Sequence, residues 1–314
     1  MKIVFMGTPQ AAVPTLERIL ADGHEVVGVY TQPDRPSGRG NRVAFSPVKQ
    51  RAIEQGIPVY QPQKIRTDES IEQFRSLQAD IAVVVAYGRI LPEAFLTAFP
   101  RSAVNVHFSL LPKYRGAAPV NWAIVNGETE TGVTTMLMDA GLDTGDVLLQ
   151  SSTAIRTTET SIELMERLAI MGADLLAETL SDLDKIEPRK QDHDMASSAP
   201  ILRKDDGMID WNLSAAEIAN RVRGFQPFPT AFTYYQGMRL TIWAAETSLA
   251  DHALQAAPGQ IVTAKGSYLI VSCGDKSTLA ISDLQLEGRR RLSTLDFLNG
   301  ISIREGEVLG RNNE

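Results

Sequence analysis

The chain has little cysteine and no long hydrophobic run, and both shortages restrict what it can be. Cys273 is the one cysteine among 314 residues, so neither an intrachain disulfide nor a cysteine metal cluster can form. No apolar segment approaches the roughly 18 residues that cross a bilayer. The apolar residues 2–6 are followed by Gly7, Thr8 and Pro9, before they reach the about 7 to 15 residues of a secretory core. We therefore expect a cytoplasmic protein that does not enter a membrane.

Signatures of several common enzyme classes are missing as well. The sequence contains neither a G-x-S-x-G serine hydrolase turn nor an H-E-x-x-H zinc pair, which disfavours nucleophilic serine catalysis and metal hydrolysis. The turn at Gly7 and Thr8 fits neither G-x-G-x-x-G nor a P-loop, so we expect Thr8 only to cap the following helix. A net charge of −7 argues against a general nucleic-acid coat, although a local basic patch could still bind RNA.

The first half of the chain alternates short apolar runs with helical periodicity. Residues 2–6 and 25–30 flank a segment with apolar side chains at helical spacing, residues 13–20, which indicates a β-α-β unit. Residues 81–86 are continuously apolar, as expected of a parallel strand buried on both faces, and residues 103–107 form another short run. The pattern predicts an α/β fold with a doubly wound, mostly parallel, Rossmann-like sheet.

The second half changes character. Residues 184–207 are crowded with charged residues, Gln, Ser and Pro and have no sustained period, which is typical of a linker. Short β-rich runs separated by glycine turns follow, at residues 231–235, 240–244, 260–264, 268–273 and 278–284. They predict a small antiparallel barrel, with the OB fold as one option. We place a first domain at residues 1–188, a linker at 189–207 and a second domain at 208–314.

The segment with most functional information is residues 105–119. Asn105 and His107 alternate with apolar residues, so on a strand of period two both polar side chains leave the same face. A rigid loop, Ser109-Leu110-Leu111-Pro112, follows directly. Another strand, expected over residues 132–138, ends in a glycine-rich loop with three carboxylates that can bring an acid to His107. The chain's other three histidines lie in contexts that favour surface or core roles.

This constellation suits one kind of chemistry. An imidazole and an amide can stabilise a developing oxyanion, while a carboxylate holds the imidazole protonated or correctly oriented. Acyl transfer between two bound substrates requires such groups, and the enzyme itself need not be acylated. Ligands in doubly wound sheets usually bind beyond the carboxyl ends of the strands, where residues 7–8, 87–88 and His107 would gather.

Two basic clusters remain. The turn-rich residues 32–42 carry Arg35, Arg39 and Arg42 with one acidic residue, Asp34, and leave the second strand at the edge assigned to ligands. A solvated surface and contact with an anionic polymer are competing interpretations. Arg289, Arg290 and Arg291 form a second basic cluster, which either serves the same nucleic acid or is a charged turn.

These residues match a known family. Asn105-x-His107, the Ser109-Leu110-Leu111-Pro112 loop and residues 142–145 (LDTG) resemble the 10-formyltetrahydrofolate-dependent formyltransferases. The resemblance extends over essentially the whole chain, through residues 31–36 (TQPDRP), 46–49 (SPVK) and 84–88 (VVAYG), and a small C-terminal barrel. It is greatest to the branch that formylates methionyl-initiator-tRNA for translation initiation, because the arginine loop is characteristic of that branch.

The resemblance implies a role for each candidate residue. Asn105, His107 and Asp143 would be catalytic, with Asp143 favouring the charged form of His107. The loop of Ser109, Leu110, Leu111 and Pro112 would contact the tetrahydrofolate, and backbone around Tyr87, Gly88, Ile90 and Leu91 would line the pterin pocket. Arg35, Arg39 and Arg42 would hold the acceptor arm of the tRNA, while the C-terminal domain with Arg289, Arg290 and Arg291 would hold its body. The implied enzyme needs no metal, and we expect a monomer.

Two alternatives stay open. A formyltransferase that acts on a sugar-nucleotide or ribonucleotide amine could share the trio of Asn105, His107 and Asp143, and a sugar-nucleotide enzyme can also carry a barrel-like second domain. It would not need the arginine loop. From another class, the chain could be a folate-binding or RNA-binding module without turnover, which the complete trio disfavours.

Overall fold

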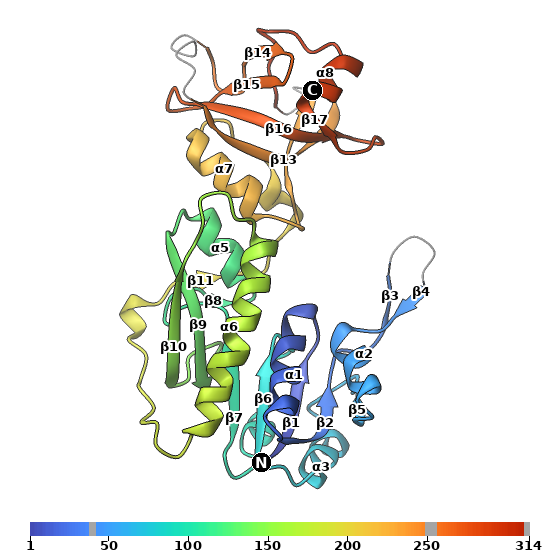
Figure 1. Ribbon diagram of the computed structural model, residues 1–314, viewed down its shortest axis with the longest axis vertical. Coiled ribbons are helices and arrows are strands. Elements are labelled where there is room, and N and C mark those ends of the chain that lie inside the picture. The colour runs from blue at the N-terminus through green and yellow to red at the C-terminus, as the bar shows by residue number, and fades with distance from the viewer. Residues whose placement is uncertain (38–41, 249–255, 311–314) are drawn as a thin grey trace. The chain divides into compact units, whose positions relative to one another are not determined.

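A computed structural model describes residues 1–37, 42–248 and 256–310 (Figure 1). The chain divides into two compact units, which are described separately below. The first comprises Met1–Pro119, Glu130–Ala154 and Leu164–Pro200, and the second comprises Val120–Thr129, Ile155–Glu163 and Ile201–Glu314. Two short segments from the first half of the chain therefore belong to the second unit. The domain boundaries at residues 188 and 207 stay a prediction.

The described part of the first unit contains one large sheet and two small two-stranded pairings. Its elements in chain order are β1 (Lys2–Gly7), η1 (Gln10–Ala12), α1 (Val13–Ala21), β2 (Glu25–Tyr30), β3 (Arg35–Ser37), β4 (Arg42–Ala44), α2 (Pro47–Glu54), β5 (Val59–Tyr60), α3 (Asp68–Ser76), β6 (Ile81–Val85), α4 (Glu93–Leu96), β7 (Ala103–His107), β8 (Arg115–Gly116), β9 (Glu130–Leu137), β10 (Val147–Ala154), α6 (Ser161–Ser181), η2 (His193–Met195) and β11 (Ser198–Ala199). Helix α6 begins in a segment of the second unit. Strands β3 and β4 pair only with each other among the described residues.

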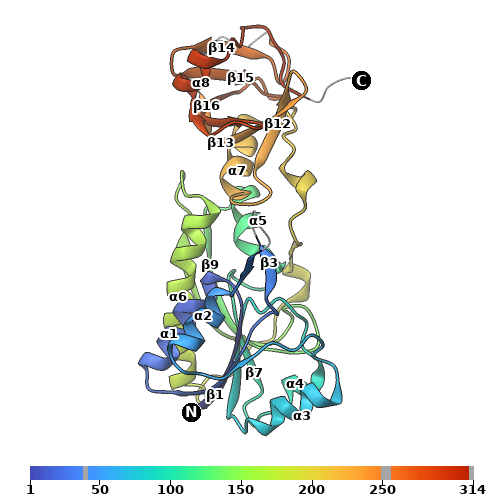
Figure 2. The same cartoon turned by 90° about the vertical axis from the view of Figure 1, so that its right-hand side faces the viewer.

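The large sheet has the strand order β10-β9-β7-β6-β1-β2-β5 in the described residues. Strands β7, β6, β1, β2 and β5 are mutually parallel, whereas β9 is antiparallel to β7 and β10 to β9. Helices α1, α2 and α6 cover one face of the sheet, and α3 and α4 cover the other (Figure 2). This sandwich explains why β6 and β7 are buried along their whole length. The predicted mostly parallel, Rossmann-like sheet is confirmed.

The parallel strands bring three chain segments to one edge. Gly7 at the end of β1 pairs with Val85 at the end of β6, and Val84 pairs with Asn105 of β7. The hydroxyl of Thr8 donates a hydrogen bond to the carbonyl of Tyr87 at 3.2 Å. Our expectation that Thr8 caps a helix is wrong, because the residue before η1 is Pro9 and α1 begins only at Val13. The hydroxyl joins two strand exits instead.

The second unit is an antiparallel sheet with helices. Its further elements are α5 (Pro119–Val125), which begins at the last residue of a first-unit segment, η3 (Lys204–Gly207), α7 (Ala215–Gly224), β12 (Ala231–Tyr235), β13 (Met238–Ser248), β14 (Ile261–Lys265), β15 (Tyr268–Ser272), β16 (Thr278–Leu286), β17 (Leu292–Ser293) and α8 (Thr294–Gly300). In its described residues the strand order is β12-β13-β16-β15-β14, with β17 beside β16. This arrangement agrees with the predicted small C-terminal barrel.

The core of the second unit rests on a well-capped helix. Ser214 and Glu217 form a reciprocal capping box at the start of α7. Its buried residues Ala215, Ile218 and Val222 lie on one side of the helix and pack into the apolar cluster of the antiparallel sheet.

Among the described helices of the whole chain, none is long and apolar enough to cross a membrane.

Candidate active site

Strand β7 supplies the first two candidate residues. Asn105 and His107 leave the same face of the strand and are 8% and 5% exposed. Backbone pairing of Asn105 with Met136 and of His107 with Thr134 places them against β9. In the described residues, the amide of Asn105 has no side-chain hydrogen bond. A buried amide without a protein partner needs another acceptor or donor, and a bound substrate can supply one.

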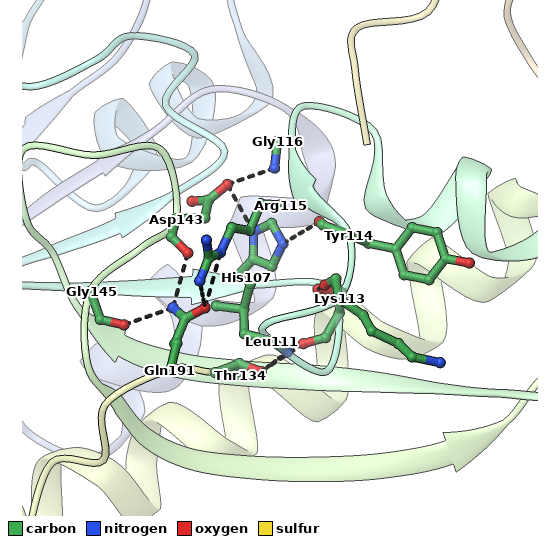
Figure 3. A network of polar contacts seen from close by, with 11 residues as sticks. His107, Leu111, Lys113, Tyr114, Arg115, Gly116, Thr134, Asp143, Gly145 and Gln191 are labelled. Carbon is green, nitrogen blue, oxygen red and sulfur yellow. Dashed lines mark hydrogen bonds and ion pairs between the residues drawn. The ribbon is translucent and has the colours of Figure 1, made fainter. Parts of the chain in front are cut away.

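The ring of His107 lies between two acceptors. Its Nε2 is 2.9 Å from the carbonyl oxygen of Tyr114, and its Nδ1 is 3.7 Å from Oδ2 of Asp143 (Figure 3). A carbonyl accepts only, so Nε2 carries a proton. A proton on Nδ1 as well would make the ring cationic and complete an ion pair with Asp143. Both ring nitrogens of His107 therefore face protein acceptors.

Asp143 is held in an unusual backbone conformation. Its φ is 54°, in the left-handed region, which costs a non-glycine residue roughly 1 to 2 kcal/mol. The backbone N–H of Gly116 donates to Oδ2 of Asp143 at 2.8 Å, and this carboxyl oxygen is the one nearest His107. Gly116 has φ of 121°, and a Cβ there would lie 2.6 Å from the carbonyl oxygen of Ala199. Only glycine fits this donor position.

The loop that carries Asp143 has to fold back to reach His107. Because β9 is antiparallel to β7, the chain leaves β9 beside the start of β7, where Met138 N donates to the carbonyl of Ala103. The predicted loop does bring an acid, Asp143, to His107. To do so it runs back along β7 from the start of that strand towards its end. Asp139 stabilises the loop internally by accepting from Gly141 N and from the hydroxyl of Thr144.

The sequence analysis assigned no role to Gln191, which touches this loop, or to Arg115, which is bonded to Gln191. Gln191 lies in the segment expected to be a linker, and Arg115 lies between the two residues whose backbones contact the His107–Asp143 pair. The side chains of Gln191 and Arg115 are hydrogen-bonded to each other (Figure 3). A glutamine in a polar stretch carries no periodic signal, so nothing in the sequence pattern pointed to it.

The loop of residues 109–112 is fixed by hydrogen bonds to Lys113 and to Thr134 of β9. The hydroxyl of Ser109 donates to the carbonyl of Lys113 at 2.7 Å, and Thr134 accepts from Leu111 N at 3.1 Å. Leu111 is buried against Met136, and Leu110 lies within reach of Gly132, where a Cβ would be 2.6 Å from the leucine. The peptide bond from Leu111 to Pro112 is cis. The Ser109 hydroxyl and the backbone carbonyls of Ser109 and Leu111 are therefore already engaged by protein groups.

Residues 87–91 show the same inward orientation. The ring of Tyr87 is buried in the core, and its carbonyl accepts from Thr8 and from Gln32 Nε2 at 2.9 Å. Gly88 has φ of 81°, and Leu91 is 4% exposed. Ile90, by contrast, is 60% exposed. The predicted pterin contacts of this segment can thus come from backbone and from Ile90, and not from the ring of Tyr87.

The first arginine cluster lies partly in two short paired strands. Arg35 and Arg42 lie in the paired strands β3 and β4, and Arg39 lies outside the described residues. At the base of this hairpin, Lys49 pairs with Asp34, which lowers the pKa of the Asp34 carboxyl; Gln61 donates to the same carboxyl at 2.8 Å.

In the second unit, Arg289, Arg290 and Arg291 are all exposed. Arg291 donates to both carboxyl oxygens of Asp283, at 3.2 and 2.9 Å, and its guanidinium lies 5.2 Å from the Trp243 ring centre. Asp283 therefore already compensates the charge of Arg291. In the described residues, no group of three or more His, Cys, Asp or Glu side chains could hold a metal ion.

Comparison with known proteins places these features in a family. Residues 1–180 match the formyl transferase family model, and residues 201–302 match the model of the formyl transferase C-terminal domain. A protein from Solibacter usitatus named methionyl-tRNA formyltransferase is 50% identical over 99% of this chain and 99% of its own length. One of the same name from Alkaliphilus oremlandii is 46% identical over 99% of this chain and 100% of its own length.

Solved structures share the fold at low sequence identity. An N-formyltransferase from Helicobacter canadensis, crystallised with folinic acid and dTDP-3-aminofucose, has a TM-score of 0.66 and 21% identity over 90% of this chain and 98% of its own. HypX from Aquifex aeolicus in complex with tetrahydrofolic acid has a TM-score of 0.62 and 15% identity over 99% of this chain and 51% of its own. The family models and the full-length relatives show that the chain belongs to the formyl transferase family.

Proposed function

We propose that this enzyme transfers the formyl group of 10-formyltetrahydrofolate to the α-amino group of methionyl-initiator-tRNA. The observation that carries the proposal is the near-complete match to relatives that bear this activity in their name, at 46–50% identity. The site geometry supports it, because β7 and the 139–146 loop supply an amide, an imidazole and a carboxylate at one place. The product would serve translation initiation.

The reaction needs one bond formed and one broken. The uncharged amine attacks the formyl carbon, a tetrahedral oxyanion forms, and the bond from that carbon to N10 breaks. The amine loses a proton, and N10 gains one. In the proposed site, Asn105 donates from its unpartnered amide to the oxyanion, and cationic His107 stabilises the negative charge that develops. Asp143 keeps the imidazole charged and oriented. None of these steps involves a metal.

The residues present fit the folate co-substrate. In the described residues the amide of Asn105 lacks a protein partner, and residues 109–112 are held in place by hydrogen bonds to Lys113 and Thr134. We assign the tetrahydrofolate contacts to Ser109, Leu110, Leu111 and Pro112, and the pterin pocket to the backbone of Tyr87, Gly88, Ile90 and Leu91. The exposed side chain of Ile90 offers apolar surface at the rim of this region.

The tRNA is assigned to the basic clusters. Arg35, Arg39 and Arg42 would meet phosphates of the acceptor arm, and Arg289 and Arg290, with Arg291 as a weaker contributor, would meet the tRNA body. We further propose that the enzyme acts as a monomer in the cytoplasm, where its tRNA substrate is found. Light scattering of the purified enzyme at several concentrations tests the monomer.

A formyl-transfer assay tests the function. The enzyme and 10-formyltetrahydrofolate are incubated with methionyl-initiator-tRNA, with a dTDP-linked amino sugar, and with a ribonucleotide amine, each at the same concentration. We expect turnover on the tRNA at least about a hundredfold above the other amines. Preferential turnover of a small amine would reject the tRNA assignment, and binding without any turnover would favour a binding module.

A further inference from the structure

We propose that Gln191 is a positioning residue for formyl transfer, which aims Asp143 at His107 by holding the backbone of the 139–146 loop. The inference rests on the proposed function, since it assigns a role within the same site. Gln191 lies about fifty residues further along the chain, in the segment between α6 and β11, and touches neither His107 nor the Asp143 carboxylate in the described contacts.

Both donor hydrogens of the Gln191 amide are used on the loop. Nε2 donates to the carbonyl of Asp143 at 2.9 Å and to the carbonyl of Gly145 at 2.7 Å (Figure 3). Gln191 is 7% exposed, so water competes little for these bonds. The side chain thereby ties down the backbone on both sides of Thr144, next to the residue whose carboxylate must face the imidazole.

Arg115 fixes the orientation of this amide. Its Nε and Nη2 donate to Oε1 of Gln191 at 3.0 and 2.6 Å. A guanidinium only donates, so Oε1 has to face Arg115 and Nε2 has to face the loop. Arg115 in turn sits between Tyr114, whose carbonyl contacts His107, and Gly116, whose N–H contacts Asp143. One short segment therefore sets the imidazole, the carboxylate and the amide that holds the loop.

The loop needs such an anchor for two reasons. It leaves β9 at the far end of β7 and folds back along the strand face, so sheet pairing alone does not place Asp143. Asp143 also has a left-handed φ of 54°, a conformation that persists only when its surroundings enforce it. The contacts of Asp139 with Gly141 and Thr144 are internal to the loop and do not fix it to the rest of the unit.

The test uses two full-length variants. Gln191→Met keeps the length of the side chain and removes all its polar contacts. Gln191→Glu keeps an oxygen for Arg115 and loses both donors to the loop, so it separates holding the loop from pairing with Arg115. We expect both variants to lower kcat for methionyl-tRNA about tenfold to a hundredfold, the scale of a small misplacement of a catalytic group. The KM for 10-formyltetrahydrofolate should change by less than about threefold.

A double-mutant cycle distinguishes positioning from mere stabilisation. If Gln191 acts through Asp143, then Gln191→Met should have little further effect on single-turnover rates in an Asp143→Ala background. Thr179→Val is the matched control in the same unit. Thr179 is a fully buried residue of helix α6 that is hydrogen-bonded to Leu175 and Thr135 and touches none of the candidate site residues in the described contacts. It should lower the melting temperature and leave kcat unchanged.

Each outcome decides a different claim. The inference is overturned if the wild-type enzyme is active and both Gln191→Met and Gln191→Glu keep its kcat. It is also overturned if the rate losses of Gln191→Met and Asp143→Ala multiply in the double variant. A wild-type enzyme that does not formylate methionyl-tRNA rejects the proposed function instead. If Gln191→Met does not fold, Gln191→Glu and Arg115→Met are measured in its place. Wild-type kcat in both of these would equally overturn the inference.

Discussion

The charged side chains of the two units are arranged in opposite ways. In the first unit, Asp143 and His107 are nearly enclosed, and Gln191, itself bonded to Arg115, gives the loop of Asp143 a defined partner. In the second unit, Arg289 and Arg290 project from an exposed turn. Bond formation requires groups placed to within a fraction of an ångström, whereas attraction of a polyanion requires only charge. Changes at His107 and Asp143 should therefore be large and interdependent, and changes at exposed arginines smaller, additive and dependent on salt.

The largest effect should follow loss of a trio member. His107→Ala and Asp143→Ala should each lower kcat about a hundredfold or more, the scale for losing an oxyanion donor or a general acid/base, with little change in folate affinity. Because the two side chains face each other, the double variant should be little worse than either single one. Wild-type turnover in either folded variant would contradict the assignment.

The arginine hairpin should affect tRNA use and not folate binding. Replacing Arg35, Arg39 and Arg42 together with Ala should raise the KM for tRNA and flatten the salt dependence of binding by roughly one unit of log-log slope for each lost phosphate contact. Exposed cations elsewhere, Arg101 and Lys185, which pair with Asp184 and Asp182, provide a charge control. An unchanged salt slope in the triple variant would show that these arginines form a solvated surface and do not contact the tRNA.

A smaller effect should separate the three arginines of the second unit. Arg289→Ala and Arg290→Ala should each lower the salt slope of tRNA binding by up to roughly one unit. Arg291→Ala should change it less, because Asp283 already pairs with this guanidinium. The measurement is the tRNA dissociation constant across a salt series. Equal slopes for all three variants would show that the ion pair with Asp283 opens when tRNA binds.

The smallest effect should come from the chain's single thiol. Cys273 is buried in the core of the second unit, and burial raises the pKa of its thiol to about 12. The nucleophilic thiolate is therefore almost absent near pH 8. We expect no alkylation by iodoacetamide in the native state and complete alkylation in urea. Mass spectrometry measures both. Rapid labelling of the native protein with loss of activity would show that Cys273 is a functional thiol, contrary to this expectation.

Much of the fold could be read from local pattern. The apolar runs at residues 25–30, 81–86 and 103–107 are strands, and each β-rich run of the second half overlaps a strand of the antiparallel sheet. Each of these strands is buried on one or both faces, and such burial shows in the sequence as the spacing and length of its apolar runs. The resemblance to formyltransferases, drawn from short motifs around Asn105 and Ser109, is confirmed by the family models. The roles of the individual site residues stay predictions.

The sequence by itself determined which residues could do chemistry, because alternation along a strand puts Asn105 and His107 on one face whatever surrounds them. Only the tertiary structure decided how Asp143 reaches them. The antiparallel direction of β9, the left-handed backbone at Asp143 and the hydrogen bonds from Gln191 to the Asp143 and Gly145 carbonyls depend on contacts between segments far apart in the chain. Local propensity does not encode such contacts, so the sequence pattern around Gln191 gave no sign that this residue bonds to the 139–146 loop.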